Sequence, residues 1–301
     1  MNDHRFDEWL ATLPITDREF AASRHAELAM KGGAYVLAAA DRRVPIPPVF
    51  YPAVFDGETR QRLSRDARTL LEGLCRLTAQ LMTDDDHRAL RDRLFADFTP
   101  LEREGVDKTW RAAEHLATAR VDFLIDEHNR PRALEMNATI PAMQGYSDAI
   151  AEGFLRAVGE LGGHNSTDLD KLIDQNGRNA DDLLQSLIAH FRRVGGRASQ
   201  LHIAIVARAQ DSQTGELEHY VRRWEHHGHQ VTIVQPEDIA RAPAGPTAQG
   251  RQIDLIYRHI FARRLDPTTS FALMLLEPDE NRIFNPMATH LELKAMLALL
   301  S

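Results

Sequence analysis

Two short polar runs in the middle of the chain carry the side chains best suited to chemistry. Arg120 and Asp122 stand at alternate positions in one run, and Glu135 and Asn137 stand at alternate positions in the other. Carboxylate and amide oxygens are the hard ligands that Mg²⁺ prefers, and a guanidinium beside them is a forked donor for a phosphate oxygen. These residue types point to a site for a divalent cation together with a phosphate group.

The four side chains share one face only if the stretch RVDFLIDEHNRPRALEMNATIPA forms a β-hairpin in a particular register. A turn at residues 128–129 places Asp122 opposite Glu135 and Arg120 opposite Asn137. Two carboxylates in direct opposition repel each other unless one is protonated or a cation lies between them. The alternative is a solvated face on which Arg120 bridges both acids, and a slip of one residue would scatter the cluster.

The same register divides the remaining side chains of the hairpin between two faces. Leu124 and Ala133 fall on the polar face. The opposite face is predicted to pack on a core, and its members are Val121, Phe123, Ile125, Leu134 and Met136.

This stretch resembles the metal-binding hairpin of circularly permuted ATP-grasp ligases, the group that includes glutathionylspermidine synthase. The likeness rests on Arg-x-Asp on one strand and Glu-x-Asn on the next, followed by alanine and, three positions later, proline. It implies that Arg120 clamps the ATP phosphates during transfer. It further implies that Asp122, Glu135 and Asn137 hold Mg²⁺, with Asn137 also part of the ATP site.

Two later segments are similar to the next landmarks of that family. IDLIYRHIFARRL matches a strand that ends in Tyr-Arg, and FNPMATHLELKAMLALL matches an Asn-Pro followed by a helix with a lysine, here Lys294. The resemblance therefore adds Lys294 to the residues expected to bind ATP. It implies a reaction in which a small-molecule carboxylate attacks the γ-phosphate of ATP and an amine captures the acyl phosphate as an amide.

The lysines expected to grip the ATP phosphates lie in a last subdomain of that family, which has no counterpart here. Lys31, Lys108 and Lys171 lie in segments predicted to be ordinary helix or linker. We therefore expect an incomplete portion of a ligase. The alternative is a non-catalytic nucleotide-binding remnant, or a subunit that needs a second chain to complete its site.

The elements that must position these residues belong to a predicted α/β fold with two domains. Residues 1–199 are expected to form a helical N-terminal region and an ATP-grasp-like metal-binding sheet. Residues 200–301 are expected to form a Rossmann-like parallel domain, because the short β-rich runs LHIAIVA and HQVTIV flank a helix. A proline- and glycine-containing stretch at 242–252 is predicted to be a loop.

Two loops are candidates for substrate contact. RAQDSQTGE joins the end of a strand to the start of a helix, where ligands often bind, so Arg208, Ser212 and Thr214 are candidates. The alternative is a plain connecting loop. MQGYSD follows the metal strand closely, so Gln144 and Ser147 could line the same cleft, unless Ser147 only caps a helix.

Composition excludes several classes of partner. A net charge of −8 gives no basic field for nucleic acid or an anionic membrane, and no apolar run approaches the ~18 residues of a membrane span. The lone Cys75 fits a reducing compartment, so we expect a cytoplasmic protein, with a homo-oligomer or second subunit left open. The histidines of WEHHGHQ are expected at a helix end and not as metal ligands.

Overall fold

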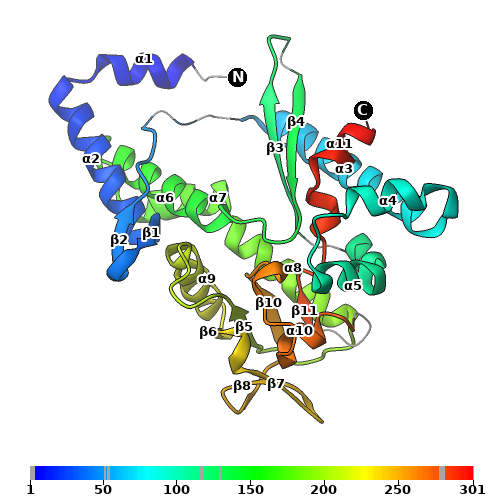
Figure 1. Ribbon diagram of the computed structural model, residues 1–301. Coiled ribbons are helices and arrows are strands. Elements are labelled where there is room, and N and C mark those ends of the chain that lie inside the picture. The colour runs from blue at the N-terminus through cyan, green and yellow to red at the C-terminus, as the bar shows by residue number, and fades with distance from the viewer. Residues whose placement is uncertain are drawn as a thin grey trace. The chain divides into compact units, whose positions relative to one another are not determined.

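Figure 1 shows the computed structural model of the chain. It describes residues 4–50, 52, 55–115, 118–128, 130–277 and 282–300. The chain forms two compact units: unit 1 comprises residues 1–60, 143–184 and 210–227, and unit 2 comprises residues 61–142, 185–209 and 228–301. The boundary near residue 200 stays a prediction, because compact units built from several segments do not by themselves locate independently folding domains.

Unit 1 is mainly helical. Its elements are α1 (His4–Thr12), α2 (Ile15–Gly32), β1 (Tyr35–Ala38), β2 (Arg42–Pro45), α6 (Gln144–Leu161), α7 (Ser166–Asn176), the start of α8 (Asn179–Arg193) and α9 (Thr214–His226). Helix α2 ends at Gly32, because Gly33 adopts the left-handed conformation that stops a helix. Helices α2 and α6 cross closely at Gly153, where a Cβ would lie 2.8 Å from the Ala29 nitrogen. Helix α7 was not predicted from the sequence.

Unit 2 contains the hairpin and a parallel sheet. Its helices are most of α3 (Gly57–Thr83), then α4 (Arg88–Leu94), α5 (Pro100–Thr109), the rest of α8, α10 (Ser270–Met274) and α11 (Lys294–Leu300). The hairpin consists of β3 (Arg120–Ile125) and β4 (Pro131–Asn137). Among the described helices, none combines the length and the hydropathy that crossing a membrane requires.

The parallel sheet confirms the predicted strand pairing of the second half of the chain. Strands β5 (His202–Val206), β6 (Gln230–Val234), β10 (Leu255–Arg258) and β11 (Ile283–Phe284) lie in the order β11-β10-β5-β6, and all neighbours are parallel. Strands β5 and β10 are in the middle of the sheet and are almost entirely buried. This burial explains their continuous apolar sequences.

The prediction of a loop at 242–252 is wrong. Strands β7 (Ile239–Ala242), β8 (Gly245–Ala248) and β9 (Arg251–Gln252) form a three-stranded antiparallel sheet. Strands of two to four residues are too short to show the alternation that identifies a strand in a sequence. Of the glycines that suggested a loop, Gly245 begins β8 and Gly250 lies in the turn between β8 and β9, and both have positive φ.

Candidate functional site

The hairpin has the register that the sequence predicts at its polar end. Arg120 lies opposite Asn137, and Asp122 lies opposite Glu135. Because directly opposed residues project to the same face of a two-stranded sheet, these four side chains form one polar cluster. The turn was predicted at residues 128–129, and residue 129 lies outside the described residues.

Beyond the cluster the register shifts at a β-bulge, and the predicted core face is wrong there. Phe123 pairs with Ala133, so Leu134 is an extra residue in β4. Ile125 and Leu134 are 47% and 51% exposed, whereas Val121 and Met136 pack in a core cluster with residues of α3. Only the half of the hairpin before the bulge therefore rests on a core.

Arg120 holds Asp122 in a two-point contact. Its Nε donates to Oδ1 at 2.7 Å and its Nη2 donates to Oδ2 at 3.2 Å. The third donor, Nη1, binds the carbonyl oxygen of Ala142 at 2.8 Å. The guanidinium is therefore bound both to the carboxylate of Asp122 and to the backbone that follows β4. These contacts fix its orientation more tightly than a single ion pair would.

Glu135 pairs with a different positively charged side chain. Lys294 Nζ lies 3.5 Å from Glu135 Oε2, and Asn137 Nδ2 donates to Glu135 Oε1 at 3.5 Å. The acid that Arg120 contacts is Asp122. Each of the two acids therefore has its own positive partner, which reduces the repulsion between them. The lysine taken from the family resemblance thus joins the four hairpin residues in one cluster.

Glu292 is part of the site and was missed from the sequence. Its Oε1 accepts hydrogen bonds from the backbone N–H groups of Ala138 and Thr139, at 2.8 and 2.6 Å. These two residues follow Asn137 directly, so the carboxylate fixes the backbone where the polar strand ends. The only signal in the sequence is an acid two positions before Lys294, which is too common a pattern to identify this role.

The two later landmarks of the sequence come together around a buried arginine. Arg258 is fully buried and donates to the carbonyl oxygens of Ile260, Asn285 and Pro286 at 2.6–2.7 Å. Burial lowers the pKa of its guanidinium to about 10. Asn285 adopts positive φ, and its Nδ2 donates back to the Arg258 carbonyl at 3.2 Å. This contact anchors the start of the segment that carries Lys294.

The candidates in RAQDSQTGE are distributed between the two units. Arg208 follows β5 at the carboxyl end of the parallel sheet in unit 2, whereas Ser212 and Thr214 lie in unit 1. The carbonyl oxygen of Ser212 accepts from the Leu37 N–H at 2.9 Å, and the Thr214 hydroxyl donates to the Asp211 carbonyl at 2.5 Å. Contact of these residues with a substrate stays a prediction.

Gln144 and Ser147 lie in the first turn of α6, in unit 1. The N-cap residue is Met143, which makes no side-chain capping hydrogen bond. Glu216 Oε1 instead accepts from the Gly145 N–H of the first turn at 2.9 Å, so the interpretation of Ser147 as a cap is wrong. Met143 has positive φ, and its carbonyl oxygen accepts from the Ser147 N–H at 3.0 Å. The placement of Gln144 and Ser147 beside the metal strand remains a prediction.

Two histidines of WEHHGHQ have partners within the protein. Within the described residues, no three or more His, Cys, Asp or Glu side chains form a group that could hold a metal ion. His227 Nε2 lies 3.1 Å from Asp181 Oδ1, and His229 Nδ1 accepts from the Leu201 N–H at 3.1 Å. The hairpin cluster offers two carboxylates and an amide, so a cation there would need further oxygen ligands from its phosphate partner or from water.

The fold has a counterpart among solved structures. No protein-family model and no curated protein matches the sequence. The chain is similar to a glutathione synthetase-like effector from Globodera pallida, solved in its apo form, with 11% identity and a TM-score of 0.52. The match covers 80% of this chain and 57% of that structure, so this chain spans a little over half of its length. At this identity the likeness concerns the fold alone, which is α/β.

Proposed function

We propose that the hairpin cluster binds Mg²⁺-ATP and serves an ATP-grasp-type ligase reaction, in which a carboxylate is joined to an amine through an acyl phosphate. The observation that supports this most is the register that places Asp122 opposite Glu135 and Arg120 opposite Asn137. Two acids in opposition on an open hairpin contribute little to folding, whereas they are well placed to bind a cation. The likeness in fold to a glutathione synthetase-like protein is consistent with this chemistry.

The side chains of the cluster fit the proposed ligand in kind. Asp122, Glu135 and Asn137 supply hard oxygens for Mg²⁺, and the bound ion would neutralise the charge of the transferring phosphoryl group. Arg120 and Lys294 already lie against these acids, at 2.7 and 3.5 Å. When a cation replaces them as partners of the acids, both side chains can turn their N–H groups to phosphate oxygens.

A second candidate function is nucleotide binding without catalysis, or catalysis only with a second polypeptide. The observation that favours it is the pairing of the other three lysines within their own helices: Lys31 with Glu27, Lys108 with Glu104 and Lys171 with Asp168. ATP-grasp catalysis needs the phosphates to be enclosed and neutralised in a water-excluded site. With few phosphate contacts, we expect dissociation constants for Mg²⁺-ATP of roughly 0.1–1 mM.

Calorimetric titration of the full chain with Mg²⁺-ATP tests the site. Asp122→Asn and Glu135→Gln should each weaken binding by about tenfold or more, because each removes a metal-binding charge. Glu127→Gln removes the same charge from the hairpin turn, outside the cluster, and should leave binding unchanged. Equal weakening in all three variants would show a general charge effect and contradict a defined site.

Stability without metal separates this function from a structural role for the acids. Asp122 and Glu135 are both part-exposed, so neutralising either should change the free energy of unfolding by less than about 1 kcal/mol. A larger loss would identify them as structural partners of Arg120 and Lys294. Substrate-dependent ADP release from a mixture of amino acids and polyamines, abolished by Glu135→Ala, would establish the ligase; binding without ADP release would establish the second candidate.

A further inference from the structure

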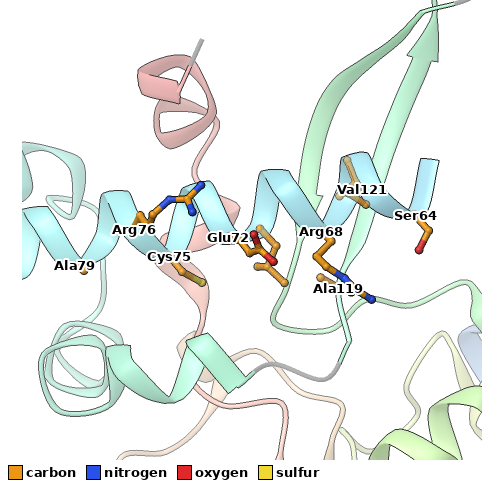
Figure 2. Close-up of a pocket in the computed structure, with 10 residues that line it drawn as sticks. Ser64, Arg68, Glu72, Cys75, Arg76, Ala79, Ala119 and Val121 are labelled. Atoms are coloured by element: carbon orange, nitrogen blue, oxygen red, sulfur yellow. The ribbon is translucent and has the colours of Figure 1, made fainter. Parts of the chain in front are cut away.

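A pocket of about 790 Å³ lies in unit 2 between α3 and the start of β3. Figure 2 shows it from the side of α3, with Val121 on the neighbouring strand. Val121 stands between Arg120 and Asp122 in sequence, and alternate residues of a strand project to opposite faces. The pocket therefore lies behind the strand that carries the polar cluster and does not belong to the proposed Mg²⁺-ATP site.

The floor of the pocket is a row of small or apolar side chains on α3. Ala67, Leu71, Cys75 and Ala79 follow one another at every fourth residue, and Val121 forms part of the opposite wall. At about 1.5 Å per residue, this row is roughly 18 Å long. The pocket volume is in the range of small-molecule sites, roughly 300–1,000 Å³, and its floor suits an elongated apolar body.

The rim of the pocket carries positive charge at two separate points. Arg68 and Arg76 line it, eight residues apart, with Glu72 midway between them (Figure 2). Neither guanidinium is hydrogen-bonded or ion-paired to another residue that the structure describes. Two arginines roughly 12 Å apart along one helix, neither of them held in an ion pair within the part of the chain that the structure describes, are open to acids from outside the chain.

We propose that this pocket binds an elongated apolar molecule with a carboxylate at each end, of the class of the long-chain dicarboxylates. The carboxylates pair with Arg68 and Arg76, and the apolar chain covers Leu71 and Cys75 between them. Glu72 repels negative charge at the middle of the ligand. The pocket therefore disfavours molecules whose carboxylates lie near the middle of the chain. Guanidinium groups suit this role because they pair with carboxylates through two parallel hydrogen bonds.

Cys75 provides a direct measurement, because it is the only cysteine of the chain and is not in a disulfide. The probe is decanedioate, and the reading is the rate at which Cys75 reacts with the uncharged reagent 4,4′-dithiodipyridine. We expect saturating decanedioate to slow the reaction at least fivefold, because the bound chain covers the thiol. Each variant is compared with its own rate without ligand, so that any change in thiol reactivity cancels.

Arginine variants test the two-ended charge recognition. Arg68→Gln and Arg76→Gln should each raise the concentration for half-maximal protection at least fivefold, while the lysine variants at these positions should retain partial protection. Arg65→Gln is the matched control, because Arg65 is an exposed arginine of the same helix that does not line the pocket. Unchanged circular dichroism of all variants confirms that the helix is intact.

Four results would overturn the proposal. No protection by decanedioate at 10 mM would show that the pocket does not take this class of ligand. Equal protection by 1,10-decanediol would show that the arginines do not recognise the ends, and equal protection by decanoate would show that one end suffices. If Arg65→Gln weakened protection as much as the two pocket variants do, the protection would depend on the overall positive charge of the helix and not on Arg68 and Arg76.

Discussion

Replacement of His290 by leucine should make the stability of the protein less sensitive to acid. His290 lies in the short 3₁₀ helix at Thr289–Glu292 and is fully buried, and neither ring nitrogen has a hydrogen-bond partner among the residues that the structure describes. Its ring meets that of Phe95 edge-on, with 6.4 Å between centroids. Burial lowers the pKa of the imidazole from 6.5 to about 4, because a charged ring would lose its hydration without gaining a partner.

The sign and size of the effect follow from proton binding. Between pH 6.5 and about 4 the unfolded chain protonates His290 while the folded chain does not, so stability is lost as pH falls through this window. At about 1.4 kcal/mol per pKa unit, the full loss is roughly 3 kcal/mol, of which about 2 kcal/mol is lost by pH 5. Burial lowers the pKa of His25 in the same sense, whereas burial raises the pKa of Glu216, which adds stability as pH falls.

Because other groups also titrate, the informative quantity is the difference between wild type and variant. Free energies of unfolding from urea denaturation at pH 7.5 and pH 5 should show that the wild type loses about 2 kcal/mol more than His290→Leu. His128→Leu, at an exposed histidine of the hairpin turn, should behave as the wild type does. Parallel pH dependence in wild type and His290→Leu would refute the lowered pKa of His290.

Three further changes test other parts of the structure. Glu292→Gln removes the charge that accepts two amide hydrogen bonds and should cost about 1–2 kcal/mol in urea unfolding; an unchanged free energy would contradict its role. Gly153→Ala forces a Cβ to 2.8 Å from the Ala29 nitrogen and should lower stability by roughly 1–3 kcal/mol, whereas Gly57→Ala, with no atom within 4 Å of its Cβ, should not. Arg208→Ala should impair substrate use with Mg²⁺-ATP affinity unchanged; equal loss of both would indicate a folding defect.

The polar end of the hairpin could be predicted from the sequence because strand alternation and one turn position determine which side chains share a face. Asp122 and Glu135 lie opposite each other as expected. The bulge could not be predicted, because nothing in the local sequence distinguishes Leu134 as an extra residue. The prediction of a core face was also wrong for the outer part of the hairpin. Exposure there depends on how far the supporting core extends, which the residues of the hairpin alone do not reveal.

Long-range contacts account for the other features that the sequence did not reveal. Glu292 reaches the backbone of Ala138 across 154 positions of sequence. Short β-rich runs did predict the parallel strands β5, β6 and β10. Strands β5 and β10 are almost entirely buried, so their continuous apolar sequences identify them, whereas β6 is an edge strand and is only partly buried. The short strands β7, β8 and β9 carry too few residues for such a pattern.

The contacts of Arg258 have a consequence for how this part of the chain can vary. All three oxygens that receive its guanidinium belong to the main chain, at Ile260, Asn285 and Pro286. Such recognition depends on the path of the backbone and not on which side chains line it. A homologous chain could therefore keep this arginine with another residue at position 260, provided that its side chain still fills the core in which Ile260 is buried. Lysine could not take the place of the arginine, since one ammonium cannot reproduce the planar spread of donors that meets three separate carbonyl groups.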